Sequence, residues 1–141
     1  MIGESLVKAI GPDLNGAIGT VPGTDSNGAE IYAELAKKDG FTAGPYSPEA
    51  YDAAALTLLA MQAANSTDSD MVKGKIFEVA NAPGEKILPG ELAKGLQILK
   101  DGGEIDYVGA TAVELIGAGE SAGSYREILV KDGKNTTVRY R

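Results

Sequence analysis

The 141-residue sequence contains no cysteine, no histidine and no tryptophan. Without cysteine there can be no disulfide, no thiolate nucleophile and no thiolate-bound metal. The absence of cysteine indicates neither an oxidising nor a reducing compartment. Without histidine, the commonest general base and the commonest metal ligand are both missing. A Ser-His-Asp or Cys-His catalytic centre therefore cannot be built. These absences argue against an enzyme, and we predict neither a metal nor a cofactor.

Positive charge is also scarce, with 13 basic residues against 20 acidic ones and a net charge of −7. Such a surface repels nucleic acid and anionic membranes, so we expect no nucleic-acid partner. The first residues lack the basic region and apolar run of a signal peptide. No run of about 18 apolar residues exists that could cross a bilayer. The chain is thus expected to be a globular protein with an acidic surface.

Length and hydrophobic content (43%) fit one ordinary globular domain. Caps and the spacing of apolar residues predict helices over residues 4–10, 29–38, 47–65, 70–81 and 91–100. Apolar runs predict strands over 16–21, 112–116, 124–130 and 136–140. The first strand is expected to be buried and to form a βα unit with the helix after it. Asp132-Gly133 predicts a closing β-hairpin.

Two helix starts carry cap signals. Ser47 is predicted as the N-cap of the 47–65 helix, with Pro48 at its first position. Thr67 and Asp70 have the spacing of a capping box before the next helix. The 47–65 helix is apolar nearly all round, which is typical of a helix buried between layers.

Residues 117–122 (GAGESA) match the G-x-G-x-x-A pattern of a dinucleotide-binding turn. That mechanism needs a helix directly afterwards, whose N-terminus holds the pyrophosphate. Gly123 interrupts such a helix, and residues 125–130 have strand character. A glycine-rich hairpin is the better interpretation, and an enzyme domain that binds a nucleotide cofactor remains an alternative.

Other polar candidates have simple structural interpretations. Asp68 and Asp70 fit a helix cap, because the calcium-loop pattern does not continue after them. Asp52 could act as a catalytic acid, but the sequence offers it no partner base. Tyr46 and Tyr51 flank a helix start, where they could pack in the core or form an aromatic wall for an apolar ligand.

Four short runs, in this order, resemble one known family. They are GTVPGT at 19–24, GPYSPEAYDAAAL at 44–56, DYVGA at 106–110 and VKDGK at 130–134. Together they are similar to the C-terminal portion of the type 1 periplasmic solute-binding proteins, the receptors of branched-chain amino acid ABC transporters. The sequence departs from the family at 116–121, where an acidic, polar turn is usual.

The resemblance implies part of a two-lobed α/β fold. By this comparison residues 1–43 contribute to the second lobe and residues 44–104 supply helices of the first lobe. Residues 105–141 would form a hinge-crossing strand and the closing hairpin. An incomplete pair of lobes leaves apolar helix faces and sheet edges uncovered, so we expect the chain to associate with itself.

The resemblance also implies a function. The whole receptor would capture a small solute in the periplasm, such as a branched-chain amino acid, and deliver it to an ABC permease. The groups that grip the amino acid come mostly from earlier segments of the family. Secondary contacts are expected from the following residues: Tyr46, Thr20, Pro22, Thr24 and Tyr51. A structural module without a ligand remains a further alternative.

Overall fold

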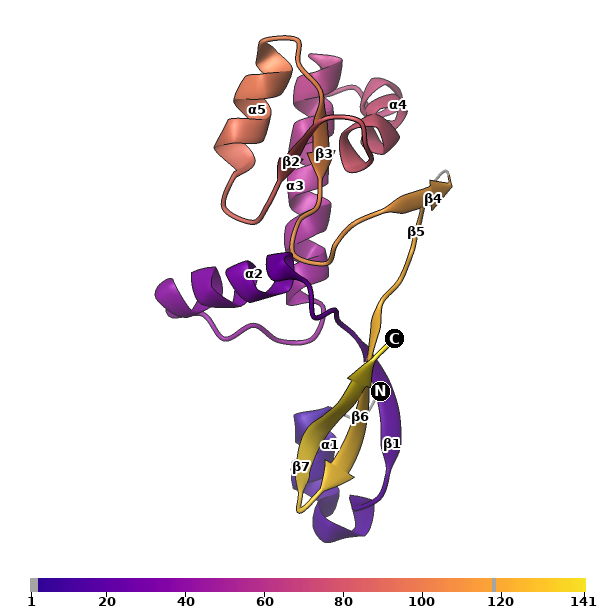
Figure 1. Cartoon of the computed structure of the whole chain (residues 1–141). Helices are drawn as coiled ribbons and strands as arrows, with labels where there is room; N and C mark the ends of the chain where they lie inside the picture. The colour runs from indigo at the N-terminus through magenta and orange to yellow at the C-terminus, as the bar shows by residue number, and fades with distance from the viewer. Residues whose placement is uncertain (1–2, 118) are drawn as a thin grey trace. The chain divides into compact units, whose positions relative to one another are not determined.

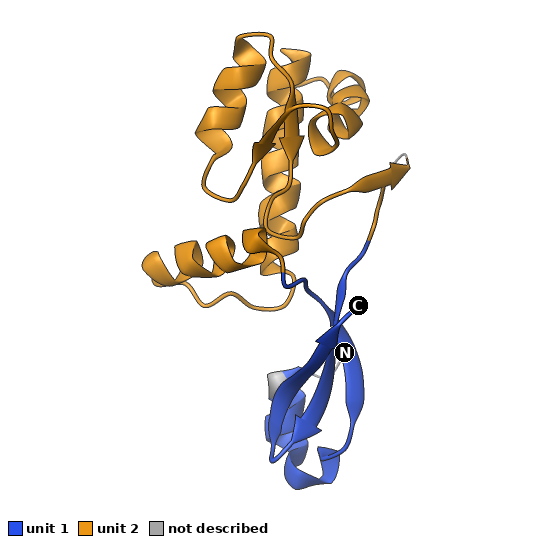
Figure 2. Cartoon of the chain, viewed as in Figure 1, with its two compact units in different colours: residues 1–25, 123–141 blue, residues 26–122 orange. Residues whose placement is uncertain are grey.

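The computed structural model describes residues 3–117 and 119–141, which fall into two compact units (Figures 1 and 2). Unit 1 takes in residues 1–25 and 123–141, and unit 2 takes in residues 26–122. The chain therefore passes between the units twice, after Asp25 and after Ala122. Ala118, within the predicted glycine-rich turn, lies outside the described residues, as do Met1 and Ile2.

Where it is described, unit 1 is a three-stranded antiparallel sheet with a short α-helix and a 3-10 helix. Its elements are α1 (Glu4–Ile10), the 3-10 helix η1 (Gly11–Leu14), β1 (Ile18–Pro22), β6 (Tyr125–Lys131) and β7 (Lys134–Tyr140). The strand order is β1-β6-β7. A small core forms where apolar side chains of α1 and the strands meet, and it contains Val7, Val21, Ile128 and Val130.

The prediction that residues 16–21 form a buried strand is only half right. The strand exists as β1, but Val21 is its one fully buried residue and Ile18 is 67% exposed. The reason is that β1 lies at the edge of its sheet and pairs antiparallel with β6 alone. It therefore does not belong to a parallel βαβ unit within the described residues.

The predicted closing hairpin is confirmed. Strands β6 and β7 pair antiparallel up to Lys131 and Lys134. Between them, Asp132 and Gly133 have φ angles of 52° and 70°. Two successive positive φ values are what a type I′ turn requires, and Asp-Gly is among the pairs that adopt it most readily.

The described residues of unit 2 form four helices and two small sheets. The helices are α2 (Asn27–Lys38), α3 (Ser47–Ala64), α4 (Ser69–Ala80) and α5 (Leu92–Lys100). The strands are β2 (Glu85–Ile87), β3 (Ile105–Tyr107), β4 (Leu115–Gly117) and β5 (Glu120–Ser121). All four helices were expected from the sequence, within two residues at each end. Strand β2 was not expected.

The parallel unit of the fold is β2-α5-β3. Strands β2 and β3 pair in parallel, and α5 connects them. Around this pair, α3, α4 and α5 bury one cluster that includes Leu59, Val79, Ile87, Ile105 and Tyr107. Burying each such side chain stabilises the fold by about 1.5–3 kcal/mol before entropy is counted. This cluster holds α3 in place at its middle.

The apolar composition of α3 predicts a helix buried on all sides, and this prediction is wrong. One stripe faces the core, with Ala55, Leu56, Leu59 and Ala60 buried. Ala53, Ala54 and Leu58 lie on the exposed side. The partner elements in unit 2 cover only one face of the helix, so the remaining apolar face is open to solvent.

Of the predicted caps, Ser47 and Thr67 are wrong, whereas the cap role predicted for Asp68 is confirmed. Helix α3 already includes Ser47, whose Oγ accepts a hydrogen bond from Gly44 N at 3.0 Å, and Tyr46 is the N-cap. Helix α4 is capped by Asp68, whose Oδ1 accepts from the Asp70 and Met71 amides at 3.1 and 3.2 Å. A carboxylate one residue nearer to the helix replaces the Thr67 hydroxyl in this role.

Candidate functional site

Strands β4 and β5 pair as a hairpin, and they do not frame a nucleotide-binding turn. Leu115 in β4 pairs antiparallel with Ser121 in β5. The next element is strand β6, so no helix N-terminus follows that could hold a pyrophosphate. The dinucleotide-binding alternative therefore lacks the element that its mechanism requires.

Tyr46 is the most exposed of the predicted aromatic contacts. It adopts a left-handed conformation, with φ 67° and ψ 2°, directly before α3. Its side chain is 48% exposed. A non-glycine residue in this region costs about 1–3 kcal/mol, and such residues often occur at functional sites. Tyr46 is therefore accessible at the start of α3, and its contact with a ligand stays a prediction.

Tyr51 makes contacts through both its ring and its hydroxyl. Its ring lies 5.3 Å from that of Tyr32 in α2, centroid to centroid, with the planes tilted by 56°. Its hydroxyl accepts a 2.8 Å hydrogen bond from the Gly90 amide. Packing accounts for this residue, which joins α2 and the turn before α5 to α3, and a ligand contact by Tyr51 stays a prediction.

The other three predicted contacts belong to unit 1. Thr20 and Pro22 lie in β1, where Thr20 is exposed, and Thr24 follows the strand half-buried. The structure describes them in a different unit from Tyr46 and Tyr51.

Thr20 lies opposite a charged cluster in its own sheet. Its cross-strand neighbour is Glu127 in β6. The Glu127 carboxylate pairs with Arg141 at 2.9 Å and with Arg139 at 3.1 Å. Hydrogen bonds from Arg141, and then from Arg139, hold the pKa of Glu127 below its ordinary value. Glu127 is therefore ionised at neutral pH, and its two arginine partners give the cluster opposite Thr20 a net positive charge.

The tightest polar arrangement in unit 2 surrounds Asp52, which is only 2% exposed. Its Oδ1 accepts hydrogen bonds from Tyr107 Oη and from the Ala110 amide, both at 2.8 Å. Its Oδ2 accepts from the Thr111 amide at 2.8 Å and from Thr111 Oγ1 at 2.7 Å. Four neutral donors therefore stabilise this buried carboxylate.

Asp52 thereby acts as a structural residue that the sequence analysis did not identify. Both of its oxygens are saturated by the protein, which removes the basis for the catalytic acid considered from the sequence. Burial, and then the negative charge of Asp52, raise the pKa of Tyr107 above its ordinary value. A signal was present, because Asp52 lies on the same helical stripe as the buried Ala55, Leu56 and Leu59.

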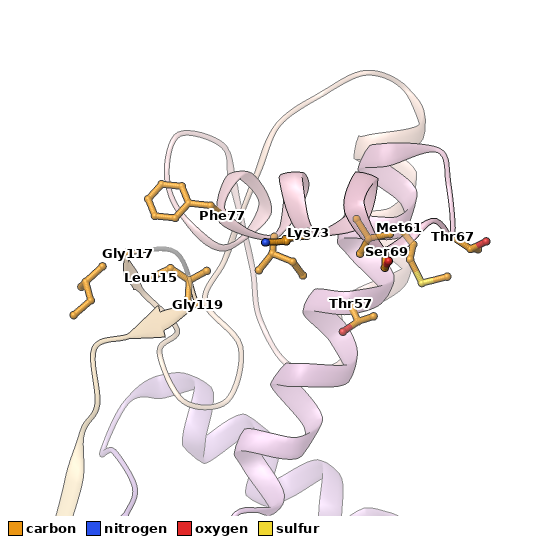
Figure 3. Close-up of a pocket in the computed structure, with 12 residues that line it drawn as sticks. Thr57, Met61, Thr67, Ser69, Lys73, Phe77, Leu115, Gly117 and Gly119 are labelled. Carbon is orange, nitrogen blue, oxygen red and sulfur yellow. The ribbon is translucent and has the colours of Figure 1, made fainter.

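An apolar groove of about 880 Å³ is a separate feature of unit 2 (Figure 3). It runs between α3, α4 and the β4–β5 hairpin, and Figure 3 shows Met61, Phe77 and Leu115 on its different walls. Lys73 is the one charged residue among the described residues that line it. Phe77 and Ile116 are 49% and 67% exposed. None of the five predicted contact residues lines this groove.

Neither a metal site nor a membrane-crossing helix is found in the described part of the chain. Those residues include no group of three or more acidic side chains that could hold a metal ion. Among the same residues, no helix has both the length and the hydropathy that a bilayer crossing needs.

The chain is similar in sequence to one known protein and in structure to another. No family model matches the chain. It is 31% identical over 115 residues to the chemotactic signal transduction system substrate-binding protein BasB of Halobacterium salinarum, an alignment that covers 81% of this chain and 28% of BasB. Its fold matches the leucine-binding protein LivK of Thermotoga maritima with a TM-score of 0.67 and 17% identity, over 97% of this chain and 34% of LivK. The chain thus spans about a third or less of either relative.

Proposed function

Since this chain has the fold of part of a type 1 periplasmic binding protein and is related in sequence to a substrate-binding protein, we propose that it is the C-terminal part of a solute-binding receptor. The observation that carries the proposal is the agreement of the two comparisons, which together cover nearly the whole chain. The receptor captures a small solute and carries out no chemistry on it. This fits a chain without histidine or cysteine.

The solute class proposed is a branched-chain amino acid or a similar small molecule. The name of LivK as a leucine-binding protein supports this class. Tyr46 is the proposed contact from unit 2, with Tyr51 behind it. Thr20, Pro22 and Thr24 are the proposed contacts from unit 1. The receptor would work in the periplasm and pass the solute to an ABC permease.

The lobe assignment remains part of this proposal. Residues 1–43 are assigned to the second lobe, 44–104 to the first, and 105–141 to the hinge strand and hairpin. Helix α2 is grouped with unit 2 in the structure, although the resemblance assigns it to the second lobe.

A second candidate function is signal reception. BasB is a substrate-binding protein of a chemotactic system, so the solute-loaded receptor could instead be sensed by a signalling partner. Both functions share solute capture and differ in the membrane protein that recognises the loaded receptor. Stimulation of permease ATP hydrolysis by the loaded receptor would support transport, and its failure in a solute-binding protein would support signal reception.

A thermal-shift screen tests solute capture. The chain would be extended by the segments that the relatives have in addition, and screened against amino acids and small organic acids. A ligand at a hundred times its Kd adds about 2.7 kcal/mol to the free energy of unfolding. A rise of several degrees in Tm with one chemical class is expected. A folded protein that responds to nothing would favour the structural-module alternative.

We also propose that this 141-residue chain associates with itself. The exposed side of α3 and the rim of the apolar groove leave Leu58, Phe77 and Ile116 open to solvent. Exposed apolar side chains of this kind favour contacts between protein molecules.

A further inference from the structure

Unit 2 has two places at which the chain arrives from unit 1 or leaves for it. The first is residues 26–28, at the start of α2, and the second is the stretch from the end of β3 to Ala122. In Figure 1 the start of α2, the start of α3 and the loop after β3 lie together within unit 2. The contacts of one buried residue, Asp52, explain why they do.

The first contact is with the loop after β3. Asp52 accepts hydrogen bonds from the amides of Ala110 and Thr111 and from the Thr111 hydroxyl. Gly109, just before them, has a φ of 61°, and a β-carbon there would overlap Asp52 Oδ1 and the Tyr107 ring. Only glycine lets the backbone approach the carboxylate this closely.

The second contact continues from that loop to α2. Gly28 is buried, and a β-carbon on it would overlap the carbonyl oxygen of Gly109. Asp52, Gly109 and Gly28 are therefore stacked in direct contact. The loop that Asp52 fixes is the surface on which the start of α2 rests.

We propose that Asp52 is a positioning residue for solute capture, because it fixes within unit 2 the loop after β3, which leads to the exit at Ala122, and through that loop the start of α2, where the chain enters. This rests on the proposed function, in which a receptor closes by bending at the connections between its parts. Tyr46, the proposed ligand contact, is the N-cap of α3 and lies six residues before Asp52 in the sequence.

Hydrogen exchange of individual amides on the full 141-residue chain tests the proposal. The informative amides are those of Ala29 and Glu30, which both bond to the Ser26 carbonyl and do not touch Asp52. In Asp52→Asn, an amide NH₂ replaces one acceptor oxygen and faces two donors. We expect exchange at Ala29 and Glu30 to quicken at least tenfold, together with exchange at Val113, whose amide bonds to the Val108 carbonyl.

Two further variants keep the test decisive if Asp52→Asn does not fold. Thr111→Val removes one hydroxyl donor to Asp52, and Thr111→Ser keeps it. Faster exchange at Ala29 and Glu30 is expected in Thr111→Val but not in Thr111→Ser. Val79→Ala, which opens the core at α4, serves as a control for general destabilisation and should not single out these amides.

The proposal is overturned if the amides of Ala110 and Thr111 are released while those of Ala29 and Glu30 keep their protection. It is also overturned if Val79→Ala quickens exchange at Ala29 and Glu30 as much as Asp52→Asn does. These readings need no solute. If exchange at Ala29 and Glu30 responds as expected but the extended protein binds no solute, only the proposed function is contradicted. If the extended protein binds a solute but exchange at Ala29 and Glu30 does not respond, only this inference is contradicted.

Discussion

Tyr107 donates a 2.8 Å hydrogen bond to the carboxylate of Asp52, a residue 55 positions earlier in the sequence, and both side chains are buried. The bond joins the end of β3 to the second turn of α3. It also places a phenol beside a buried negative charge that has no cationic partner among the described residues. The stability of unit 2 should therefore depend on this pair and on pH.

Removing the Tyr107 hydroxyl should destabilise the protein. In Tyr107→Phe, Asp52 Oδ1 keeps only the Ala110 amide, so we expect a loss of about 1–3 kcal/mol in the free energy of unfolding. Urea denaturation at pH 7 measures this. No loss would show that the bond contributes nothing to stability.

The same pair predicts how stability falls at alkaline pH. The folded pKa of Tyr107 lies above its ordinary value of 10.0 because of burial and the nearby Asp52 charge. Above about pH 10 the unfolded chain releases this proton while the folded chain keeps it, so stability decreases by up to about 1.4 kcal/mol per pH unit. Tyr107→Phe lacks this contribution, and the gap between the two proteins should narrow from pH 9 to pH 11 (about the range in which tyrosine titrates). A gap that widens would contradict this account.

Replacing Ala112 by glycine should stabilise the protein. It has a φ of 54° in an exposed turn, a conformation that costs alanine about 1 kcal/mol more than glycine. Ala112→Gly is expected to raise Tm by a few degrees. Ala54→Gly, on the exposed side of α3, is the matched control and should lower stability by about 1 kcal/mol. Equal effects of the two substitutions would be inconsistent with the left-handed turn.

Two helix glycines should respond oppositely to alanine. A β-carbon on Gly28 would overlap the Gly109 carbonyl oxygen, whereas one on Gly74 in α4 would meet nothing within 4 Å. Gly28→Ala is expected to destabilise by more than about 2 kcal/mol. Gly74→Ala should stabilise by about 0.5–1 kcal/mol, because alanine is the better helix former. Thermal unfolding of both variants would decide, and a tolerated Gly28→Ala would mean that α2 does not rest on the Gly109 loop.

Self-association should depend on the groove. Light scattering at micromolar concentration is expected to give a mass above 14.5 kDa for the chain. The double variant Phe77→Ser, Ile116→Ser should shift it toward the monomer, while Ile18→Ser in unit 1 should not. A wild-type chain that is monomeric under these conditions would refute the prediction.

The helices could be predicted because their signals are local. Caps, apolar spacing and glycine stops all lie within or beside each helix, and Asp132-Gly133 signals its hairpin in the same way. Strand β2 could not be predicted, since two of its three residues are exposed and its state depends on pairing with β3, which begins 18 residues after β2 ends.

The candidate site shows the same limit. Tyr46 and Tyr51 were noticed because they flank a helix start, and their contact with a ligand remains a prediction. The role of Asp52 could not be predicted because its donors lie 55–59 residues further along the chain. Its position on the buried stripe of α3 indicated burial but not the partners.

The central claim is that this chain is part of a solute receptor, and titration calorimetry tests it most directly. Leucine, as the first solute of the proposed class, would be titrated into the folded, extended protein, with glucose as a control of different chemistry. The account predicts saturable binding at one site per molecule for leucine or a related amino acid and no heat with glucose. A folded protein that gives no binding heat with any amino acid or small acid would contradict it.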